Sequence, residues 1–533
     1  MALAALLATA AGAALAADPK QGGTMTATFK DDVSTLDPAI GYDWQNWSMI
    51  KSLFSRLMDY KPGTTELTPD LAESFTISPD GLTYTFKLRH GVKFHNGREM
   101  TADDVAYSYN RTVDPKTQSP GQGFFKSIAG YDDVAAGKAA AMTGVKVVDP
   151  YTIALTLAKP DATFLQVVAL NFAGVVAKED VAQYGADYGH HPDGTGAFYL
   201  DHWTLGQELV LKRNPDYYMK GQPYLDQLDF KIGAEPLTAL LQLQKGEIDY
   251  AGDGIPPAKF LEVMADPEQK KLVVQAPQLE TSYLTIKTTM KPFDNLKVRQ
   301  AINMAINKDR IVKIINGRAD VANQPLPPGM PGYDKDYKGF AYDPDKAKAL
   351  LKEANYDASQ SFDLYVYNTD PNPRIAQAIQ QDLAAVGMTV AIKSLDQANI
   401  IAAGGEPDQA PLIWSGGMGW IADFPDPSDF YGPILGCAGA VKGGWNWSLY
   451  CNKDMEALAA KADGMVKPEE AQARADLWKQ IFDKIQDDAA WAPVFNEERY
   501  TMHSARLGGD PSLFVDPVHV PVNYNYVYAT DAQ

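Results

Sequence analysis

The residues best suited to chemistry lie between positions 414 and 430, where the sequence reads WSGGMGWIADFPDPSDF. Carboxylates stand at Asp423, Asp426 and Asp429, and the prolines among them exclude a regular helix. A carboxylate and an aromatic face both favour positive charge, so Trp420 and Asp423 together predict a seat for an organic cation. A solvated acidic loop explains the same residues.

A second candidate is Arg374, in the run Asp370-Pro371-Asn372-Pro373-Arg374 that precedes a helical pattern. We expect Asn372 to cap this helix and Pro373 to take its first position, which places Arg374 in the first turn. Free N–H groups and a guanidinium together favour an anion. A salt bridge to Asp370 explains the arginine equally well from spacing alone.

Two short strands are predicted to position these candidates. Residues 412–414 are apolar and end at a glycine turn, which would deliver Trp420 and Asp423 to a cleft. Residues 362–367 alternate in polarity as a strand does and lead into the Arg374 segment.

The N-terminal part of the chain also has clear periodicity. Residues 22–29 alternate as a first strand, and residues 42–60 carry apolar side chains at helical spacing. Trp44 and Trp47 fall within this helical pattern and are interpreted as packing residues.

The length and the net charge limit the classes of protein that fit this sequence. At 533 residues the chain is too long for a single core, so two or three domains are expected. The net charge of -19 arises from 48 basic and 67 acidic residues and repels polyphosphate and anionic lipid. Nucleic acid is therefore excluded as an expected partner.

Residues 1–17, MALAALLATAAGAALAA, form an apolar run that fits a secretory signal peptide, although no Lys or Arg precedes it. Later segments are not apolar for long enough to span a bilayer, so we expect an exported, soluble protein. In such a protein Cys437 and Cys451 favour a disulfide, because no neighbouring His or Cys supplies a metal set. No metal and no cofactor are expected.

Residues 69–111, PDLAESFTISPDGLTYTFKLRHGVKFHNGREMTADDVAYSYNR, closely resemble the signature segment of the family 5 extracellular solute-binding proteins. These are the dipeptide- and oligopeptide-type receptors of ABC importers. Further blocks match in the family's order: Gly194-Thr195-Gly196 with Phe198, and residues 212–218, 246–249, 298–301 and 342–347.

The resemblance implies an α/β protein with the type II periplasmic-binding-protein fold, in which two α/β lobes close around a hinge and an extra α+β domain lies beside the first. Lobe I is expected at residues 18–55, 190–275 and 492–533, the additional domain at 56–189 and lobe II at 276–491. The implied protein is a periplasmic monomer that captures short peptides and delivers them to an ABC permease in the inner membrane.

The resemblance also assigns roles to residues. The pattern from Gly419 to Pro427 matches the family's ammonium-binding loop, so Asp423 is expected to bind a ligand's α-ammonium. Arg374 is expected to bind the free carboxylate. Trp420, Gly419 and Met418 complete the predicted ligand-binding set, and Asp426 and Asp429 become loop structure. The Cys437–Cys451 pair resembles a disulfide found after this loop in peptide receptors.

Alternatives remain open at this point. Relatives on this scaffold take oligosaccharides, opines or metal chelates. A secreted hydrolase would use Asp423 and Asp426 as acid and base, since paired carboxylates beside an aromatic platform suit glycoside cleavage. Against this, the acids lie on one short loop and no second acid cluster is identifiable, so we expect no catalytic residues and no enzyme activity.

Overall fold

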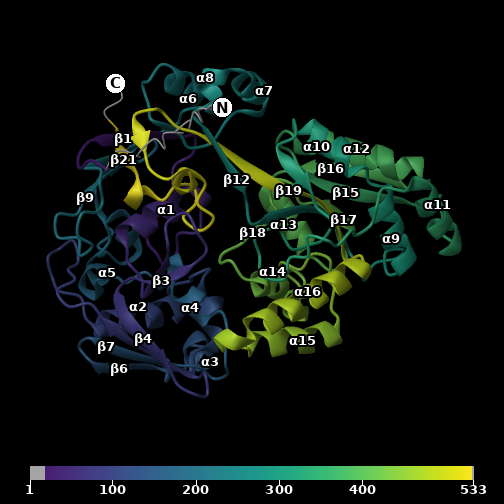
Figure 1. Cartoon of the computed structure of the whole chain (residues 1–533). Helices are drawn as coiled ribbons and strands as arrows, with labels where there is room; N and C mark the ends of the chain where they lie inside the picture. The colour runs from purple at the N-terminus through teal and green to yellow at the C-terminus, as the bar shows by residue number, and fades with distance from the viewer. Residues whose placement is uncertain (1–18, 531–533) are drawn as a thin grey trace, which may run out of the picture.

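The computed structural model describes residues 19–530, and the predicted signal peptide at residues 1–17 lies outside this range. Two bodies stand side by side, one formed by the purple and blue segments and one by the green segments (Figure 1). The yellow strand β19 (Trp491–Met502) runs from one body to the other.

The first lobe is organised around a sheet with the strand order β11-β1-β10-β9-β8, in which β1 lies parallel to both neighbours. Its strands are β1 (Thr24–Phe29), β8 (Phe198–Thr204), β9 (Glu208–Arg213), β10 (Gln227–Ile232) and β11 (Tyr250–Ala251). Its helices are α1 (Trp44–Leu53), α6 (Pro236–Gln244), α7 (Pro257–Ala265) and α8 (Pro267–Lys270), and the short pair β20 (Leu507–Gly508) and β21 (Tyr528–Ala529) lies near the C-terminus.

The additional domain has its own antiparallel sheet, in the order β4-β5-β7-β6. Its strands are β2 (Met58–Tyr60), β3 (Leu67–Pro69), β4 (Ala72–Ile77), β5 (Thr83–Leu88), β6 (Val145–Asp149) and β7 (Thr152–Thr156). Its helices are α2 (Ala102–Val113), α3 (Tyr131–Ala135), α4 (Phe164–Val167) and α5 (Lys178–Tyr184). Helix α2 begins at a capping box made by Thr101 and Asp104.

The second lobe contains the sheet path β12-β19-β13-β17-β15-β16, with β14 paired to β19 and β18 paired to β13. The strands are β12 (Val273–Pro277), β13 (Glu280–Ile286), β14 (Ala319–Val321), β15 (Ser361–Tyr367), β16 (Thr389–Leu395), β17 (Leu412–Trp414) and β18 (Trp420–Ile421). The helices are α9 (Leu296–Ala305), α10 (Lys308–Ile314), α11 (Pro344–Glu353), α12 (Asn372–Ala385), α13 (Gln397–Gly404), α14 (Pro427–Ile434), α15 (Lys453–Asp463) and α16 (Ala471–Asp487).

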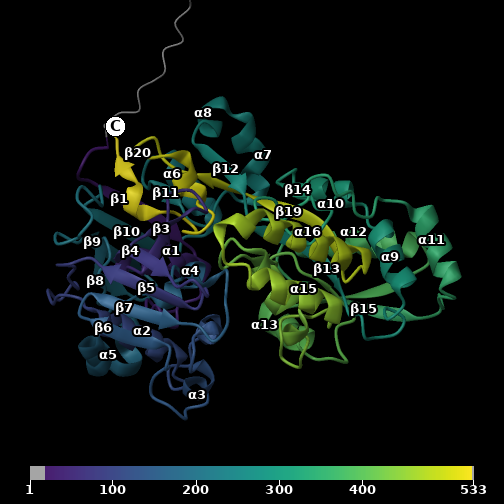
Figure 2. The ribbon, with the colours of Figure 1, turned by 60° about the horizontal axis from the view of Figure 1, so that its bottom comes forward.

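Strands β12 and β19 pair antiparallel and connect the lobes, as both ribbon views show (Figures 1 and 2). The start of β19, at Ala492 and Val494, is buried in the second lobe's core. Its end, at Tyr500 and Met502, packs instead with residues of α6 and α7. A two-stranded connection of this kind is a natural hinge, because few other backbone bonds hold the lobes together.

The predicted strands at residues 22–29, 362–367 and 412–414 are confirmed as β1, β15 and β17. The helix predicted over residues 42–60 is shorter, because α1 ends at Leu53 and Phe54 is extended. The carbonyl oxygen of Leu53 accepts a hydrogen bond from Gly196 N–H at 2.9 Å, in place of another helical turn. A Cβ at Gly196 would lie 2.2 Å from the Ser52 oxygen, so glycine is required for this approach.

Within residues 19–530, none of the helices is long and apolar enough to cross a membrane.

Candidate ligand-binding site

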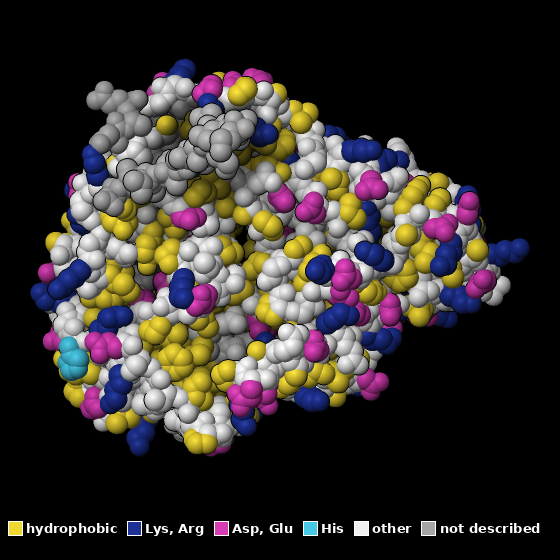
Figure 3. Space-filling view, viewed as in Figure 1, with side chains coloured by type: hydrophobic (Ala, Val, Ile, Leu, Met, Phe, Trp, Pro, Cys, Tyr) yellow, Lys and Arg dark blue, Asp and Glu magenta, His cyan; other side chains and the backbone are white. Residues whose placement is uncertain are grey.

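A cleft of about 970 Å³ lies between the lobes and is bordered by the additional domain. Aromatic side chains from all three parts of the chain form much of its wall: Tyr42, Trp47, Phe124, Trp420, Phe424 and Trp445. In the space-filling view a groove runs between the two halves of the molecule, with apolar side chains along its border (Figure 3). The volume lies at the upper end of the range of about 300 to 1,000 Å³ that is usual for small-molecule pockets.

Strand β17 positions the candidate ligand-binding loop, residues 415–429. Its residues are buried, and the chain then turns sharply through Gly416 and Gly417 before β18. Gly417 has a positive φ of 73°, and a Cβ at Gly416 would lie 2.3 Å from Trp414 Nε1, so this turn requires glycine at both positions. As predicted, the turn brings Trp420 and Asp423 to the cleft, where Met418 and Gly419 also lie.

Asp423 is buried, with 7% of its surface exposed, although it lines the cleft. Its Oδ1 accepts a hydrogen bond of 2.5 Å from the hydroxyl of Tyr42, which belongs to the first lobe. Its Oδ2 is buried and has no hydrogen-bond partner within residues 19–530. A buried carboxylate oxygen without a partner is costly, so the site favours a donor or cation supplied by a ligand.

Asp429 supports Asp423 from behind. Its Oδ2 accepts hydrogen bonds from the Asp423 backbone N–H at 2.9 Å and from Trp420 Nε1 at 3.1 Å. These bonds fix the orientation of both neighbours, so the expectation that Asp429 has a structural role agrees with its contacts.

Burial raises the pKa of Asp423 to about 7, against the lowering effects of the Tyr42 hydroxyl and of the neighbouring Asp429 carboxyl group. Burial also raises the pKa of Asp429 well above its usual range, and the charge of Asp423 adds to this effect. The pair therefore resists double ionisation, and a cation bound at Asp423 would stabilise the charged form.

The cleft as a whole is acidic. Burial raises the pKa of Asp463, another lining residue, to about 7. The ionisable lining residues apart from tyrosines are Asp161, Asp423, Asp429 and Asp463 against Lys126 and Lys159.

Asp426 faces away from the cleft. It caps α14 through Ser428 N–H at 3.0 Å and accepts two bonds from the Arg474 guanidinium, at 2.6 and 2.8 Å. Both side chains of this ion pair are buried. These contacts agree with the expected structural role and leave no free carboxylate for acid–base chemistry.

Arg374 does not line the cleft in this structure. Its guanidinium makes two bonds of 2.7 Å to Asp370, and both side chains are more than half exposed. The predicted cap is wrong: α12 begins at Asn372, and Pro371 precedes it without a side-chain cap bond. The Asn372 amide is used elsewhere, since its Oδ1 accepts a 3.0 Å bond from Trp414 Nε1.

The predicted disulfide is confirmed, since Cys437 and Cys451 are bonded. The loop that it closes carries Trp445 and Trp447, which stack on each other with ring centroids 5.9 Å apart. Both line the cleft, and Trp445 also meets the edge of Trp420.

Sequence reasoning missed several cleft residues. Trp44 and Trp47, interpreted as packing residues, both line the cleft, although Trp47 is also part of the core. Tyr42 and Phe124 carry no local signal, because their partners Asp423 and Phe424 lie far along the chain. The aromatic pair at 445 and 447 was detectable, since it stands inside the predicted disulfide loop.

Two α/β lobes joined by paired hinge strands, with an acidic cleft between them, define a solute-binding protein of the type II periplasmic-binding fold. The chain belongs to the bacterial extracellular solute-binding proteins, family 5, which match it over residues 66–442. This is a family of substrate-binding transport proteins, not of enzymes, which excludes the hydrolase alternative.

Individual relatives cover nearly the whole chain. Di/tripeptide-binding protein 2 of Pseudomonas aeruginosa (strain UCBPP-PA14) is 32% identical over 529 residues, which span 95% of this chain and 94% of that protein. Heme-binding protein A of Haemophilus influenzae is 32% identical over 478 residues, 86% of this chain and 84% of that protein.

Among solved structures, the ABC transporter-associated periplasmic binding protein DppA from Helicobacter pylori, in complex with the peptide STSA, superposes with a TM-score of 0.79. It is 28% identical, and the match covers 96% of this chain and 98% of that one. The predicted fold class is thereby confirmed.

Proposed function

We propose that this protein captures short peptides with a free amino terminus in the periplasm and delivers them to an ABC permease in the inner membrane. The observation that carries this proposal is the buried, unpaired Oδ2 of Asp423 at the wall of the cleft. An α-ammonium there would complete a charge-assisted bond, which contributes roughly 1.5 to 3 kcal/mol.

Family identity alone leaves the ligand open, because relatives of equal identity are named for di/tripeptides and for heme. The chemistry of the cleft favours the peptide. Heme carries carboxylates and no ammonium group, and neutral oligosaccharides offer hydroxyl donors but no positive charge, so neither would neutralise the buried carboxylate as an α-ammonium does. An opine or a cationic chelate would compete for the same site.

Arg374 is the proposed partner of the ligand's free carboxylate, and it would exchange its bonds to Asp370 for the ligand. Its segment lies against the ligand-binding loop, since a Cβ at Gly417 would stand 3.0 Å from the Asn372 amide nitrogen. The exposure of the Arg374–Asp370 pair supports the exchange, because exposed ion pairs contribute only about 0 to 1 kcal/mol.

Contacts that cross the cleft favour closure of the two lobes. Tyr42 of the first lobe and Asp423 of the second already share a hydrogen bond, and Ala162 N–H of the additional domain donates to the Asp463 carbonyl at 2.8 Å. A ligand that contacts both lobes would shift the population further toward this closed arrangement.

We also propose the chain division expected from the resemblance, with lobe I at residues 18–55, 190–275 and 492–533, the additional domain at 56–189 and lobe II at 276–491. Separate apolar cores for the sheets of the three parts support it. The protein is proposed to act as a monomer, since each sheet buries its apolar face within the chain.

The test is a thermal-shift screen followed by calorimetry. Di- and tripeptides should raise the melting temperature, whereas their N-acetylated forms, cello-oligosaccharides and heme should not. Stabilisation by neutral sugars alone would overturn the peptide assignment, and so would equal affinity for a peptide and its N-acetyl form.

The role of Arg374 is tested with Arg374→Ala. We expect about a tenfold or greater loss of affinity for a peptide with a free carboxylate, and little change for the same peptide as a C-terminal amide. Equal loss for both ligands, or no loss for either, would leave Arg374 as a partner of Asp370 only.

A further inference from the structure

A smaller pocket of about 270 Å³ lies beside the cleft, at the hinge between the lobes. Trp44, Gly417, Gly419 and Ile421 line both cavities, so the two meet along one stretch of the ligand-binding loop. A ligand that follows this loop from Asp423 would therefore pass the mouth of the small pocket.

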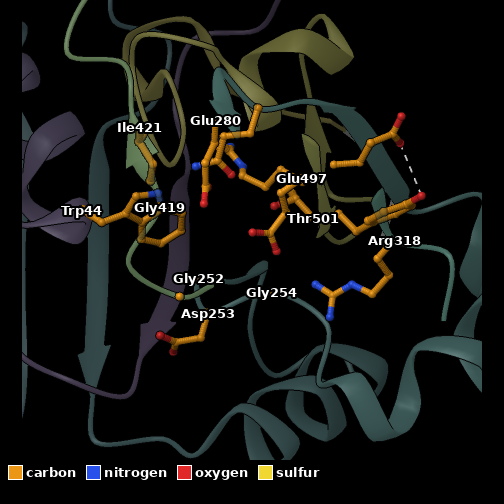
Figure 4. Close-up of a pocket in the computed structure, with 15 residues that line it drawn as sticks. Trp44, Gly252, Asp253, Gly254, Glu280, Arg318, Gly419, Ile421, Glu497 and Thr501 are labelled. Atoms are coloured by element: carbon orange, nitrogen blue, oxygen red, sulfur yellow. Dashed lines mark hydrogen bonds between the residues drawn. The ribbon is translucent and has the colours of Figure 1, made fainter. Parts of the chain in front are cut away.

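Glu280 and Glu497 project into the small pocket from neighbouring strands, β13 and β19 (Figure 4). The strands continue side by side here, since Gln278 N–H donates to the Glu497 carbonyl at 3.0 Å. Glu280 is only 4% exposed. Within residues 19–530, no Lys, Arg or His makes a salt bridge to either carboxylate.

Burial and the neighbouring Glu497 raise the pKa of Glu280 well above its usual range. Burial also raises the pKa of Glu497, but Arg318 acts in the opposite direction. Like charges in such a place are costly unless a proton or a cation lies between them. The Ser282 side chain lowers the pKa of Glu280, but Glu280 lacks the cationic compensation that Arg318 gives to Glu497.

Gly419 makes this arrangement possible. A Cβ at Gly419 would lie 2.2 Å from Glu280 Oε1, so any side chain there would displace the carboxylate. The same glycine belongs to the ligand-binding loop, which means that Glu280 stands directly behind the backbone that borders the cleft.

Three other charged groups of the pocket, Glu498, Asp253 and Arg499, are already engaged. Glu498 accepts bonds from Gln275 at 2.8 Å and from Tyr500 at 3.3 Å, and Asp253 accepts one from Lys30 N–H at 2.8 Å. Arg499 donates to backbone carbonyls of the C-terminal segment, among them that of Phe514 at 2.7 Å.

Arg318 stands at the side of the pocket over the Phe260 ring, 5.3 Å from its centroid (Figure 4). No group of three or more His, Cys, Asp or Glu within the described residues is arranged to hold a metal ion. A metal is thus a poor match for the pocket, whereas an organic cation needs only hydrogen-bond acceptors on two sides.

We propose that this pocket is a specificity subsite that takes the cationic side chain of a bound peptide, a lysine or an arginine, between Glu280 and Glu497. The proposal rests on the peptide-binding function proposed above and narrows it to peptides with a basic residue. An alkyl stem would pass the Trp44 ring and Ile421, and the charged end would reach the carboxylates.

The test is calorimetry at pH 7 with variants of trialanine. In each variant one alanine, at the first, second or third position, is replaced by lysine or by norleucine, its uncharged analogue. We expect the wild-type protein to bind one of the lysine peptides at least about tenfold more tightly than its norleucine partner. Glu280→Gln and Glu497→Gln should each reduce this ratio to about threefold or less, while norleucine peptides keep their wild-type affinity.

Glu498→Gln is the matched control, because it removes a carboxylate of the same pocket that already has partners; the lysine preference should survive it. If trialanine binds but lysine and norleucine peptides are equal at every position, the subsite is refuted and the peptide function stands. If the preference persists in both Glu280→Gln and Glu497→Gln, another group recognises the lysine and the subsite is refuted. If no peptide binds at all, the proposed function fails and the subsite with it.

Discussion

Replacement of Asp423 by Asn isolates the effect of the charge at the wall of the cleft. The amide has the same shape, and its oxygen can keep the bond from the Tyr42 hydroxyl that reaches Asp423 Oδ1. The change falls on Oδ2, the buried atom that lacks a partner. An NH₂ group in that place points hydrogen toward a ligand ammonium instead of a lone pair.

The magnitude follows from the lost interaction. A hydrogen bond to a charged group contributes about 1.5 to 3 kcal/mol, which corresponds to a loss of affinity of about 10- to 150-fold. Without a ligand the variant should be at least as stable as the wild type, because burial raises the pKa of Asp423 to about 7 and the charged form therefore destabilises the folded protein at neutral pH.

Calorimetry with a dipeptide and its N-acetyl derivative measures this effect. The wild-type protein should discriminate strongly between the two ligands, and Asp423→Asn should bind both with the low affinity of the acetylated one. A variant that binds the free dipeptide as well as the wild type does, with an unchanged melting temperature, would show that the ammonium lies elsewhere in the cleft.

Further predictions concern the same loop and its supports. Affinity for a dipeptide should be highest between about pH 7 and 8: it falls below pH 7 as Asp423 takes up a proton, and above pH 8 as the α-amino group of the ligand loses one, which calorimetry across pH would measure. Tyr42→Phe should weaken binding about tenfold and move the acidic limb of that profile to higher pH, since the Tyr42 bond lowers the pKa of Asp423; an unshifted limb would contradict this role. Asp426→Ala should cost about 3 to 5 kcal/mol of stability in chemical denaturation, because the largely buried Arg474 loses both close carboxylate contacts and keeps only the longer one to Asp463, at 3.9 Å. Affinity should stay within about threefold; a stable variant with weakened binding would reverse the roles given to Asp426 and Asp423.

The sequence was sufficient to predict features that depend on neighbouring residues. The glycine turn after β17 places Trp420 and Asp423 within a few positions of a buried strand, so periodicity and turn chemistry locate both. The disulfide was likewise predictable, because the chain holds only two cysteines. The fold class was predicted from the resemblance of the motif blocks, and of their order along the chain, to those of the family.

Features that depend on tertiary contacts were not predictable in this way. The hydroxyl of Tyr42 donates a hydrogen bond to Asp423, although 381 positions separate the two residues in the chain. The sequence near either residue gives no indication of this contact. Asn372 is a residue type that often caps helices, and it lies at the start of α12. In the fold, however, its side-chain oxygen accepts a hydrogen bond from the Trp414 indole and does not cap the helix. The sequence around Glu280 and Glu497 gives no indication that they share a pocket. Only the pairing of β13 with β19 brings the two side chains together.

The distribution of uncompensated charge explains why closure should depend on a ligand. Asp423 stands on one side of the ligand-binding loop and the pair of Glu280 and Glu497 on the other. Within residues 19–530 none of these three carboxylates makes a salt bridge, although Arg318 lies at the side of the small pocket and acts on Glu497. Closing the lobes around water alone would leave these carboxylates in a poorly solvated cleft, where they must take up protons or remain costly. A peptide with a free amino terminus and a basic side chain would supply a cation at both places. A ligand shifts a conformational equilibrium only by its differential affinity for the two states, so these two proposed contacts would make closure selective by forming fully only when the lobes are closed.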